Sequence, residues 1–483
     1  MKNTARFLLL ALLFGLILTA CSGTVQDEEF DFDFNGGGSA GVDLDGFEMV
    51  YEFGTPETEG LLNDNVLGYT PNTIFSDLAL ERLNQVQQDY NCKITVNYNN
   101  TDNCHKFVST SMSGIFMCDV ISGISDMWSN VARIDMLVGM SEVADYIDYK
   151  NEEKWGTRNM LEVIYYEDDL YGLFPMAWPE LCISYFGYPL VFNENYILSR
   201  GMTDPREYVE NGTWDYDNFR QFLVDATDVQ GGETRVYGLS THREYFTEMF
   251  MRTNGSSLIY KDANGNYQPG FYTSEAMKAM EEARELYYGD YAYTINHNDA
   301  DVTGSVDCFI EGRSAMCVAL TKYLYGQDAR ISMNVDRYGI LTWPHGPDAD
   351  PSRVYSIMEN NEYCIAISRM TSSPDACAII LNALYEPLPG FETYDQIRDH
   401  MLKYYFFDER DCDNFYAMFN HQEYNYFHYG VRATTINFLD SPNSSITQVL
   451  EKNRDKSINE IDEYIMPSIR GIVAVWGDYE PLK

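Results

Sequence analysis

The chain has 483 residues, of which 45% are hydrophobic and 14% aromatic, so most of it can fold around extensive cores and intrinsic disorder is excluded for most of its length. It carries 33 Lys and Arg residues against 74 Asp and Glu residues, a formal net charge of −41. So large an acidic excess repels phosphate backbones, and no run of Lys or Arg offers a local exception, so we expect no nucleic-acid partner.

The N-terminal segment has the pattern of an export signal. Lys2 and Arg6 precede an apolar stretch over residues 7–20, which is too short for an ordinary transmembrane helix. The stretch ends in Leu18-Thr19-Ala20-Cys21, which resembles the lipobox of bacterial lipoproteins. The resemblance implies that residues 1–20 are a signal peptide, that Cys21 receives a diacylglycerol group, and that the chain is anchored by lipid to the extracytoplasmic face of the cell membrane. A plain secretory signal with an incidental cysteine is the alternative.

Residues 21–46 have the composition of a tether. This segment is rich in Asp, Glu and Gly and contains no Lys or Arg. Repulsion between like charges and the conformational freedom of glycine keep such a chain extended and mobile. We therefore expect the folded part to begin near residue 47.

The first elements of the folded part alternate between strand and helix patterns. Apolar residues alternate over 47–53 and again over 93–98, and they recur at helical spacing over 80–90 between these two strands. A helix over 106–112 and a strand over 118–122 follow. Repeated strand–helix–strand order favours a mainly parallel sheet, and ligands of such α/β sheets gather beyond the carboxyl ends of the strands.

Several short stretches along the chain carry a further pattern. They are Leu83 to Tyr98, Ser111 to Gly114 with Cys118 to Ile121, Asp168 to Pro175, Leu190 to Tyr196, Thr213 to Phe219, Thr253 to Gly255, Phe309 to Met316, and Tyr338 to Pro344. In this order they are similar to family 1 extracellular solute-binding proteins, the lipoprotein receptors of carbohydrate ABC importers. Cys118 stands where this family usually has a proline.

The resemblance implies a two-lobed α/β fold like that of the type II periplasmic binding proteins, with the lobes joined by hinge strands. Carried onto this chain, the N-terminal lobe takes residues 47–191 and 337–385. The C-terminal lobe takes residues 192–336 and 386–483.

A cleft for a neutral sugar needs paired donors and acceptors for hydroxyl groups and flat rings for C–H patches. The candidates stand on loops that follow strands, although a Trp is more often part of a core than of a binding platform. The candidate ligand-binding residues are Asp126, Trp128, Trp178, Glu180, Asn254, Trp343 and Glu362. We assign Trp214 to structure, as a hydrophobic staple beside the N-cap candidate Asp215.

Other chemistry has weak support in the sequence. Asp262 begins a segment that starts like a calcium loop, but Tyr267 and Thr273 break the pattern and a hairpin turn fits better. Most cysteines read as buried thiols, and Cys92 and Cys104 flank a predicted strand and could pair. We expect no catalytic residue, no metal site and no cofactor.

The sequence therefore predicts a monomeric, lipid-anchored receptor that binds a sugar or oligosaccharide between two lobes and delivers it to an ABC permease. Three alternatives stay open. They are a cell-surface enzyme that degrades glycans, a binding protein for a peptide or another small polar solute, and a structural or adhesive lipoprotein.

Overall fold

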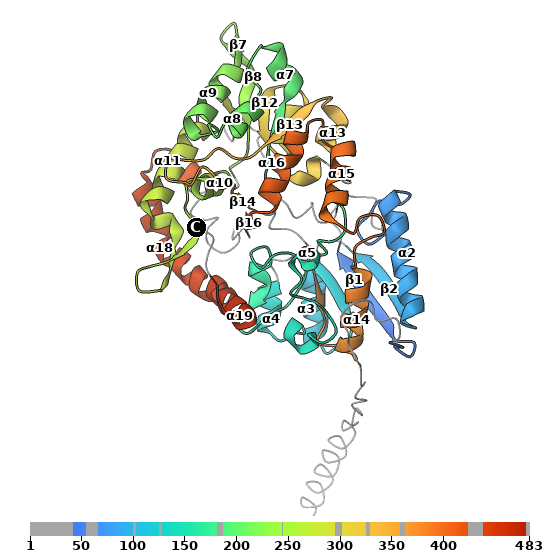
Figure 1. Cartoon of the computed structure of the whole chain (residues 1–483). Coiled ribbons are helices and arrows are strands. Elements are labelled where there is room, and N and C mark those ends of the chain that lie inside the picture. Colours follow the sequence, from blue (N-terminus) through green and yellow to red (C-terminus); the bar gives the residue numbers. More distant parts are fainter. Residues whose placement is uncertain are drawn as a thin grey trace, which may run out of the picture. The chain divides into compact units, whose positions relative to one another are not determined.

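The computed structural model describes residues 42–54, 66–99, 103–124, 128–180, 187–243, 245–294, 302–324, 329–357, 363–423 and 438–479. Residues 43–483 belong to one compact unit, shown in Figure 1. This unit has the two-lobed α/β architecture that the sequence predicted, because it contains two separate sheets with helices packed on each. No helix within the described ranges is long and apolar enough to cross a membrane.

A four-stranded sheet is the core of the first lobe. Its order is β15-β3-β1-β2, with β1, β2 and β3 parallel and β15 antiparallel. The strands are β1 (Glu48–Gly54), β2 (Lys93–Asn99), β3 (Val120–Ile124) and β15 (Tyr363–Ile367).

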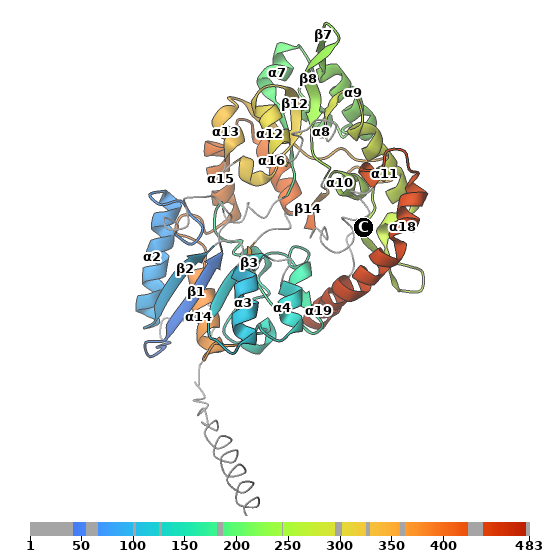
Figure 2. The same ribbon diagram turned by 180° about the vertical axis from the view of Figure 1, so that it is seen from behind.

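The helices of this lobe cover both faces of the sheet. The chain steps from β1 to one neighbour and then crosses back past β1 to the other, so right-handed crossovers place α2 (Ile74–Asp89) and α3 (Asn103–Met112) on opposite faces. Helix α14 (Pro374–Leu384) packs beside α2, and Figures 1 and 2 show α14 and α3 on opposite sides of the strands. The predicted order of strands and helices at the start of the fold is therefore confirmed.

A second sheet is the core of the other lobe. Its order is β11-β8-β12-β6-β13. Strand β7 also pairs with β8, outside this order. The strands are β6 (Leu190–Asn193), β7 (Asp228–Gln230), β8 (Glu233–Ser240), β11 (Ala292–Tyr293), β12 (Ser314–Val318) and β13 (Tyr338–Leu341). The expected lobe boundaries stay a prediction, but β13 pairs with β6 in this sheet although the sequence placed residues 337–385 in the first lobe.

The remaining elements surround the two sheets. The helices are α4 (Trp128–Arg133), α5 (Glu152–Trp155), α7 (Glu194–Ser199), α8 (Arg206–Glu210), α9 (Tyr216–Ala226), α10 (Phe246–Thr253), α11 (Ser274–Tyr287), α12 (Val302–Ile310), α13 (Arg330–Asn334), α15 (Tyr394–Tyr404), α16 (Glu409–Phe419), α18 (Ile446–Glu460) and α19 (Met466–Trp476). Two-stranded ladders join β4 (Tyr165–Tyr166) to β5 (Asp169–Leu170), β9 (Ile259–Lys261) to β10 (Tyr267–Pro269), and β14 (Ser356–Ile357) to β16 (Gln422–Glu423).

Two local expectations are confirmed. Asp215 caps α9 by accepting a hydrogen bond from the Asn218 N–H, and the Trp214 ring meets the Phe219 ring edge-on at 5.4 Å, which is the contact of a hydrophobic staple. The segment after Asp262 is the turn between β9 and β10, and the Asp262 carboxylate accepts the Asn264 and Asn266 N–H groups. These hydrogen bonds are those of a hairpin turn, as expected.

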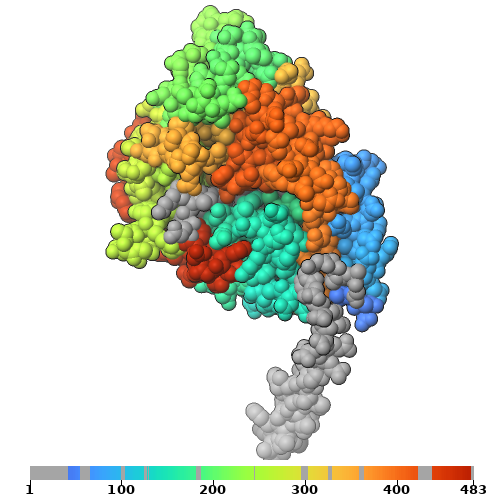
Figure 3. Space-filling view, in the orientation of Figure 1, coloured from blue at the N-terminus to red at the C-terminus, as the bar shows by residue number. Residues whose placement is uncertain are grey.

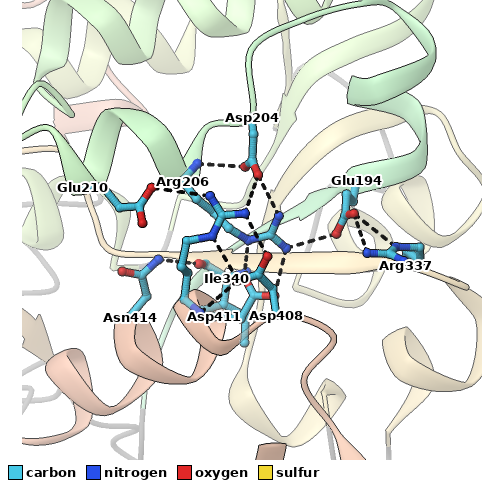
Figure 4. A network of polar contacts seen from close by, with 10 residues as sticks. Glu194, Asp204, Arg206, Glu210, Arg337, Ile340, Asp408, Asp411 and Asn414 are labelled. Atoms are coloured by element: carbon cyan, nitrogen blue, oxygen red, sulfur yellow. Dashed lines mark hydrogen bonds and ion pairs between the residues drawn. The ribbon is translucent and has the colours of Figure 1, made fainter.

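A buried ion-pair network holds the outer strand of the second sheet (Figure 4). The Arg206 guanidinium is 1% exposed and donates to both oxygens of Asp411, at 2.7 and 2.8 Å, and to Glu194 at 3.1 Å. Burial raises the pKa of Asp411, whereas the hydrogen bonds from Arg206 lower it. Each buried charge in this network therefore has a partner, as burial in a low dielectric requires.

The same network covers an open strand edge. Strand β13 ends the sheet order, so the peptide groups on its outer side lack a neighbouring strand. Helix α16 supplies the missing partners, because the Ile340 N–H donates to Asp411 at 2.8 Å and the Asn414 amide donates to the Ile340 carbonyl at 2.9 Å. Asp411 thus neutralises Arg206 and fixes the position of β13.

Replacing Asp411 by Ala should lower the free energy of unfolding by about 3–5 kcal/mol, because it leaves the buried Arg206 charge without its main partner. Urea denaturation measures the change. The matched control is Glu48→Ala, which breaks a surface pair with Lys93 in which both side chains are more than half exposed and should cost about 1 kcal/mol or less. Equal losses in the two variants would contradict a structural role for the buried network.

Candidate functional site

The carboxyl ends of the parallel strands β8, β11, β12 and β13 lie at one edge of the second sheet, together with the amino end of the antiparallel β6. The corresponding ends of β1, β2 and β3 in the first sheet lead into residues outside the described ranges. Because ligands of open α/β sheets bind beyond the carboxyl ends of the strands, the described part of the candidate site lies at the edge of the second sheet.

An aromatic cluster occupies this edge. The rings of Tyr188 and Tyr245 are stacked with centroids 4.0 Å apart, and the His242 ring meets both of them edge-on. Trp343, which follows β13, donates from Nε1 to the Tyr188 carbonyl at 2.6 Å. We call Tyr188, His242, Tyr245 and Trp343 the edge cluster. It brings together segments that are far apart in the sequence.

The backbone of Tyr245 is in the left-handed region, with a φ of 63°. Such a conformation is costly for a large side chain, and non-glycine residues that adopt it are concentrated at functional sites. Tyr245 stands at the N-cap of α10, five residues after the end of β8. The turn therefore directs the ring onto Tyr188 while α10 begins at the next residue.

Helix α10, which begins directly after Tyr245, buries two polar side chains in its first turn. Glu248 is 1% exposed and Thr247 is fully buried, and among the described residues neither Glu248 Oε1 nor Thr247 Oγ1 has a hydrogen-bond partner. Burial raises the pKa of Glu248 to about 7, and the charge of Arg252 opposes that rise. Buried polar atoms without partners are costly, so these two atoms are candidates for hydrogen bonds with a ligand.

The arrangement is suited to binding a polyhydroxylated molecule. Flat ring faces pack on C–H patches, and nearby carboxyl, hydroxyl and imidazole groups can pair with hydroxyls. Across the described ranges there is no cluster of three or more His, Cys, Asp or Glu side chains arranged to hold a metal ion.

Trp343 is the predicted residue that lies in the edge cluster. Its ring is 5% exposed and also meets the rings of Phe246 and Phe250 of α10 edge-on, at 5.9 Å each. It therefore forms the wall between the cluster and the core of the second lobe.

Trp178 and Glu180 lie together at another place, where the first lobe meets α15. The Trp178 ring is fully buried, stacks on Tyr69 at 5.8 Å, and donates from Nε1 to the Glu386 carbonyl at 3.0 Å. Glu180 accepts the Tyr405 hydroxyl at 2.5 Å and lies 3.6 Å from His400. In Figure 3 the orange surface around α15 and α16 adjoins the green surface of the second lobe and the teal surface of the first. These contacts connect the two lobes.

The other candidates are placed differently. Trp128 begins α4 and is fully buried, with its ring against Gly123 of β3. Asn254 is fully buried, donates to the Glu275 carbonyl and to Asp348, and accepts the Asp348 N–H, so it fixes the loop after β13. Asp126, Glu362 and Cys21 lie outside the described residues. Ligand contact for every candidate stays a prediction.

Sequence reasoning missed Tyr188, His242, Tyr245 and Glu248. Tyr188 stands in Gly187-Tyr188-Pro189 just before a strand, which is a position that could have identified it. The left-handed turn at Tyr245 has no comparable signal, because tyrosine rarely adopts that conformation. The described cysteines are buried and form no disulfide bonds, so Cys92 and Cys104 do not pair.

Replacing Glu248 by Gln should change how stability depends on pH. The raised pKa means that the folded chain binds a proton that the unfolded chain releases, so wild-type stability should fall as pH rises from about 4.5 through about 7. The variant should lack this component, which amounts to up to about 3 kcal/mol at about 1.4 kcal/mol per pKa unit. Urea denaturation at several pH values measures it.

The matched control for this pH dependence is Glu233→Gln, at an exposed position in β8. That variant should keep the wild-type pH profile. A Glu248→Gln profile parallel to that of the wild type would contradict a neutral buried carboxyl.

No model of a known protein family matches the chain, and no curated protein matches it. Solved structures do. The GacH receptor of Streptomyces glaucescens, solved unliganded and with acarbose, is 12% identical and aligns with a TM-score of 0.57 over 86% of this chain and 99% of its own. A cyclo/maltodextrin-binding protein complexed with maltotetraose is 12% identical, with a TM-score of 0.58 over 86% of this chain and 97% of its own.

A sugar transporter from Rhizobium etli, in an open conformation, is also 12% identical, with a TM-score of 0.60 over 85% of this chain and 99% of its own. These neighbours are binding or transport proteins rather than enzymes. At this identity the likeness shows the fold. The two-lobed fold of the periplasmic binding proteins, which the sequence resemblance implied, is thereby confirmed.

Proposed function

We propose that the chain is a receptor that binds a sugar or oligosaccharide between its two lobes and delivers it to an ABC permease. One observation carries the proposal: the two-lobed fold aligns with nearly the whole length of proteins that bind acarbose or maltotetraose. The agreement spans both sheets, because 86% of this chain is aligned.

The edge cluster supplies the chemistry that this function requires. The rings of Tyr188 and Tyr245 stack on each other and are 2% and 5% exposed, so they would serve as an apolar platform when the lobes open, with His242 as a polar ring beside them. Glu248 and Thr247 add buried oxygen atoms that lack partners within the described ranges. Pairing these atoms with ligand hydroxyls would remove a cost of about 1–3 kcal/mol each, which favours a hydroxyl-rich ligand over an apolar one.

Release of the ligand to a permease requires that the ligand-bound and ligand-free forms of the receptor differ in conformation. A ligand that contacts both lobes stabilises the form in which the lobes are closed, because the full set of contacts exists only there. The contacts of Glu180 with Tyr405 and His400 lie on the segments that connect the lobes, so they are placed to bend or shift during closure. The permease would recognise the closed form.

The N-terminal sequence supports anchoring at the outer face of the membrane. We propose that Cys21 carries a diacylglycerol group after removal of residues 1–20. Two acyl chains provide stable attachment to a bilayer, which a single chain does not. The acidic, glycine-rich segment that follows would then let the receptor move near its permease.

A thermal-shift screen against mono- and oligosaccharides should identify ligands that raise the melting temperature. At one hundred times Kd a ligand adds about 2.7 kcal/mol to the free energy of unfolding. The saccharide should be recovered intact, since a receptor forms no new reducing ends. Stabilisation by peptides but not by any saccharide would contradict the proposal, and cleavage of the saccharide would indicate an enzyme.

A variant of the edge cluster locates the site of binding. Tyr245→Asn removes the ring but keeps a residue that tolerates a positive φ, so the turn before α10 should survive. Loss of the stacked ring should weaken saccharide binding at least about tenfold, equivalent to about 1.4 kcal/mol. Tyr260→Ala, at an exposed tyrosine on β9, is the control. Unchanged affinity in the Tyr245 variant would place the site elsewhere.

Replacing Cys21 by Ser should release the protein from the membrane fraction into the medium, because the acyl chains have no other attachment point. Fractionation with labelled fatty acid measures both effects. Retention of the variant in the membrane fraction with undiminished label would contradict anchoring at Cys21.

A further inference from the structure

Three large apolar side chains are exposed at the C-terminal end of α3. Met112 is 73% exposed, Ile115 58% and Phe116 48%. They lie within five residues of one another, and we call them the α3 tip. Single exposed apolar residues are normal on soluble proteins, but three large ones within five residues suggest a contact surface.

Local geometry explains why the core does not cover these side chains. Helix α3 ends in a Schellman motif, with Gly114 at a φ of 69°, the Ile115 N–H donating to the Thr110 carbonyl and the Gly114 N–H to the Ser111 carbonyl. In this motif the residue at the position of Ile115 usually packs on an apolar residue in the preceding turn. Here that turn contains Ser109 and Thr110, so Ile115 has no apolar partner in it.

The α3 tip lies at the edge of the first sheet where the N-terminal segment joins the fold. Residues 113–119 lead into the amino end of β3, and residues 43–47 lead into the amino end of the parallel β1. The Leu44 N–H donates to the Tyr90 carbonyl, just before β2, which fixes the incoming chain at this edge. The carboxyl ends of β1, β2 and β3 are at the opposite edge of this sheet.

The length of the preceding segment sets its reach. From Cys21 to Asp43 the chain has 22 residues, which span at most about 75 Å. A lipid on Cys21 would therefore keep this edge of the first sheet within that distance of the bilayer. Tethering makes a weak second contact effectively intramolecular, so even a small apolar surface is occupied for much of the time.

We infer that the α3 tip is a membrane contact, which inserts Met112, Ile115 and Phe116 into the boundary between lipid headgroups and acyl chains. This inference rests on the proposed anchoring at Cys21. Apolar side chains at such a boundary bind in proportion to the apolar area that they bury. The strong acidity of the chain provides no attraction to anionic lipids, so the contact is apolar and insensitive to salt. It directs the carboxyl ends of β1, β2 and β3 away from the bilayer.

The test uses the full lipidated chain on phosphatidylcholine vesicles that contain a nitroxide-labelled phosphatidylcholine. An environment-sensitive fluorophore is attached to the thiol of Phe116→Cys, and the unsubstituted chain treated with the same reagent gives the background, since its described cysteines are buried. The matched control is Met333→Cys on α13, at a position that is 78% exposed in the second lobe. A further sample carries Met112→Ser and Ile115→Ser in addition to Phe116→Cys.

We expect the nitroxide lipid to quench the fluorophore at position 116 more strongly than at position 333. This quenching should persist at high salt and be lost in the sample with the two serine substitutions. Equal quenching at both positions, or none at 116 in a chain that floats with the vesicles, would overturn the inference and leave the anchor intact. A chain that does not float with the vesicles would overturn both the anchor at Cys21 and the membrane contact. The proposed saccharide binding is tested separately, by thermal shift.

Discussion

The pairing of Arg206 with Asp411 determines where the candidate site can form. Asp411 also accepts the Ile340 N–H, so this one carboxylate sets the position of strand β13. Strand β13 leads directly to Trp343, which bonds to the Tyr188 carbonyl, and Tyr188 stacks on Tyr245. The stacked rings are thus connected to the buried ion pair through one strand and two contacts, and their geometry depends on charges that lie outside the edge cluster.

Burying the Arg206 guanidinium costs desolvation free energy, and this cost explains why carboxylates surround it. A buried guanidinium is tolerated only when its donors are satisfied, and Glu194, Asp204 and Asp411 all lie within 3.2 Å of Arg206. The alternative, an apolar contact, could not have supplied an acceptor for the exposed edge of β13. Because the carboxylate performs both tasks, α16 is held to the sheet in a defined register, which an apolar helix face would fix less strictly.

Patterns over a few neighbouring residues correctly predicted the strands and the helix cap that depend on interactions between those residues. The alternation over 47–53 and 93–98 corresponds to β1 and β2, and the staple of Trp214 with its cap at Asp215 forms as expected. Within α2 the helical spacing was predicted correctly, but Leu80 is 46% exposed and the buried face runs through Phe75, Ala79 and Val86. The placement of β13 could not be predicted from its own residues, because its partners β6 and α16 are distant in the sequence.

The candidate site was harder to predict because its residues are defined by long-range pairing and by backbone strain. The sequence identified loops after strands and selected their tryptophans, yet Trp128 and Trp178 are fully buried. Trp343 supports the stacked rings of Tyr188 and Tyr245, which are themselves only 2% and 5% exposed. Tyr245 acquires its position from a left-handed turn that tertiary packing imposes against its own preference. The conformation of Tyr245 is set by packing with residues that are distant in the sequence. Neither periodicity nor composition could therefore indicate that its ring belongs to the candidate site.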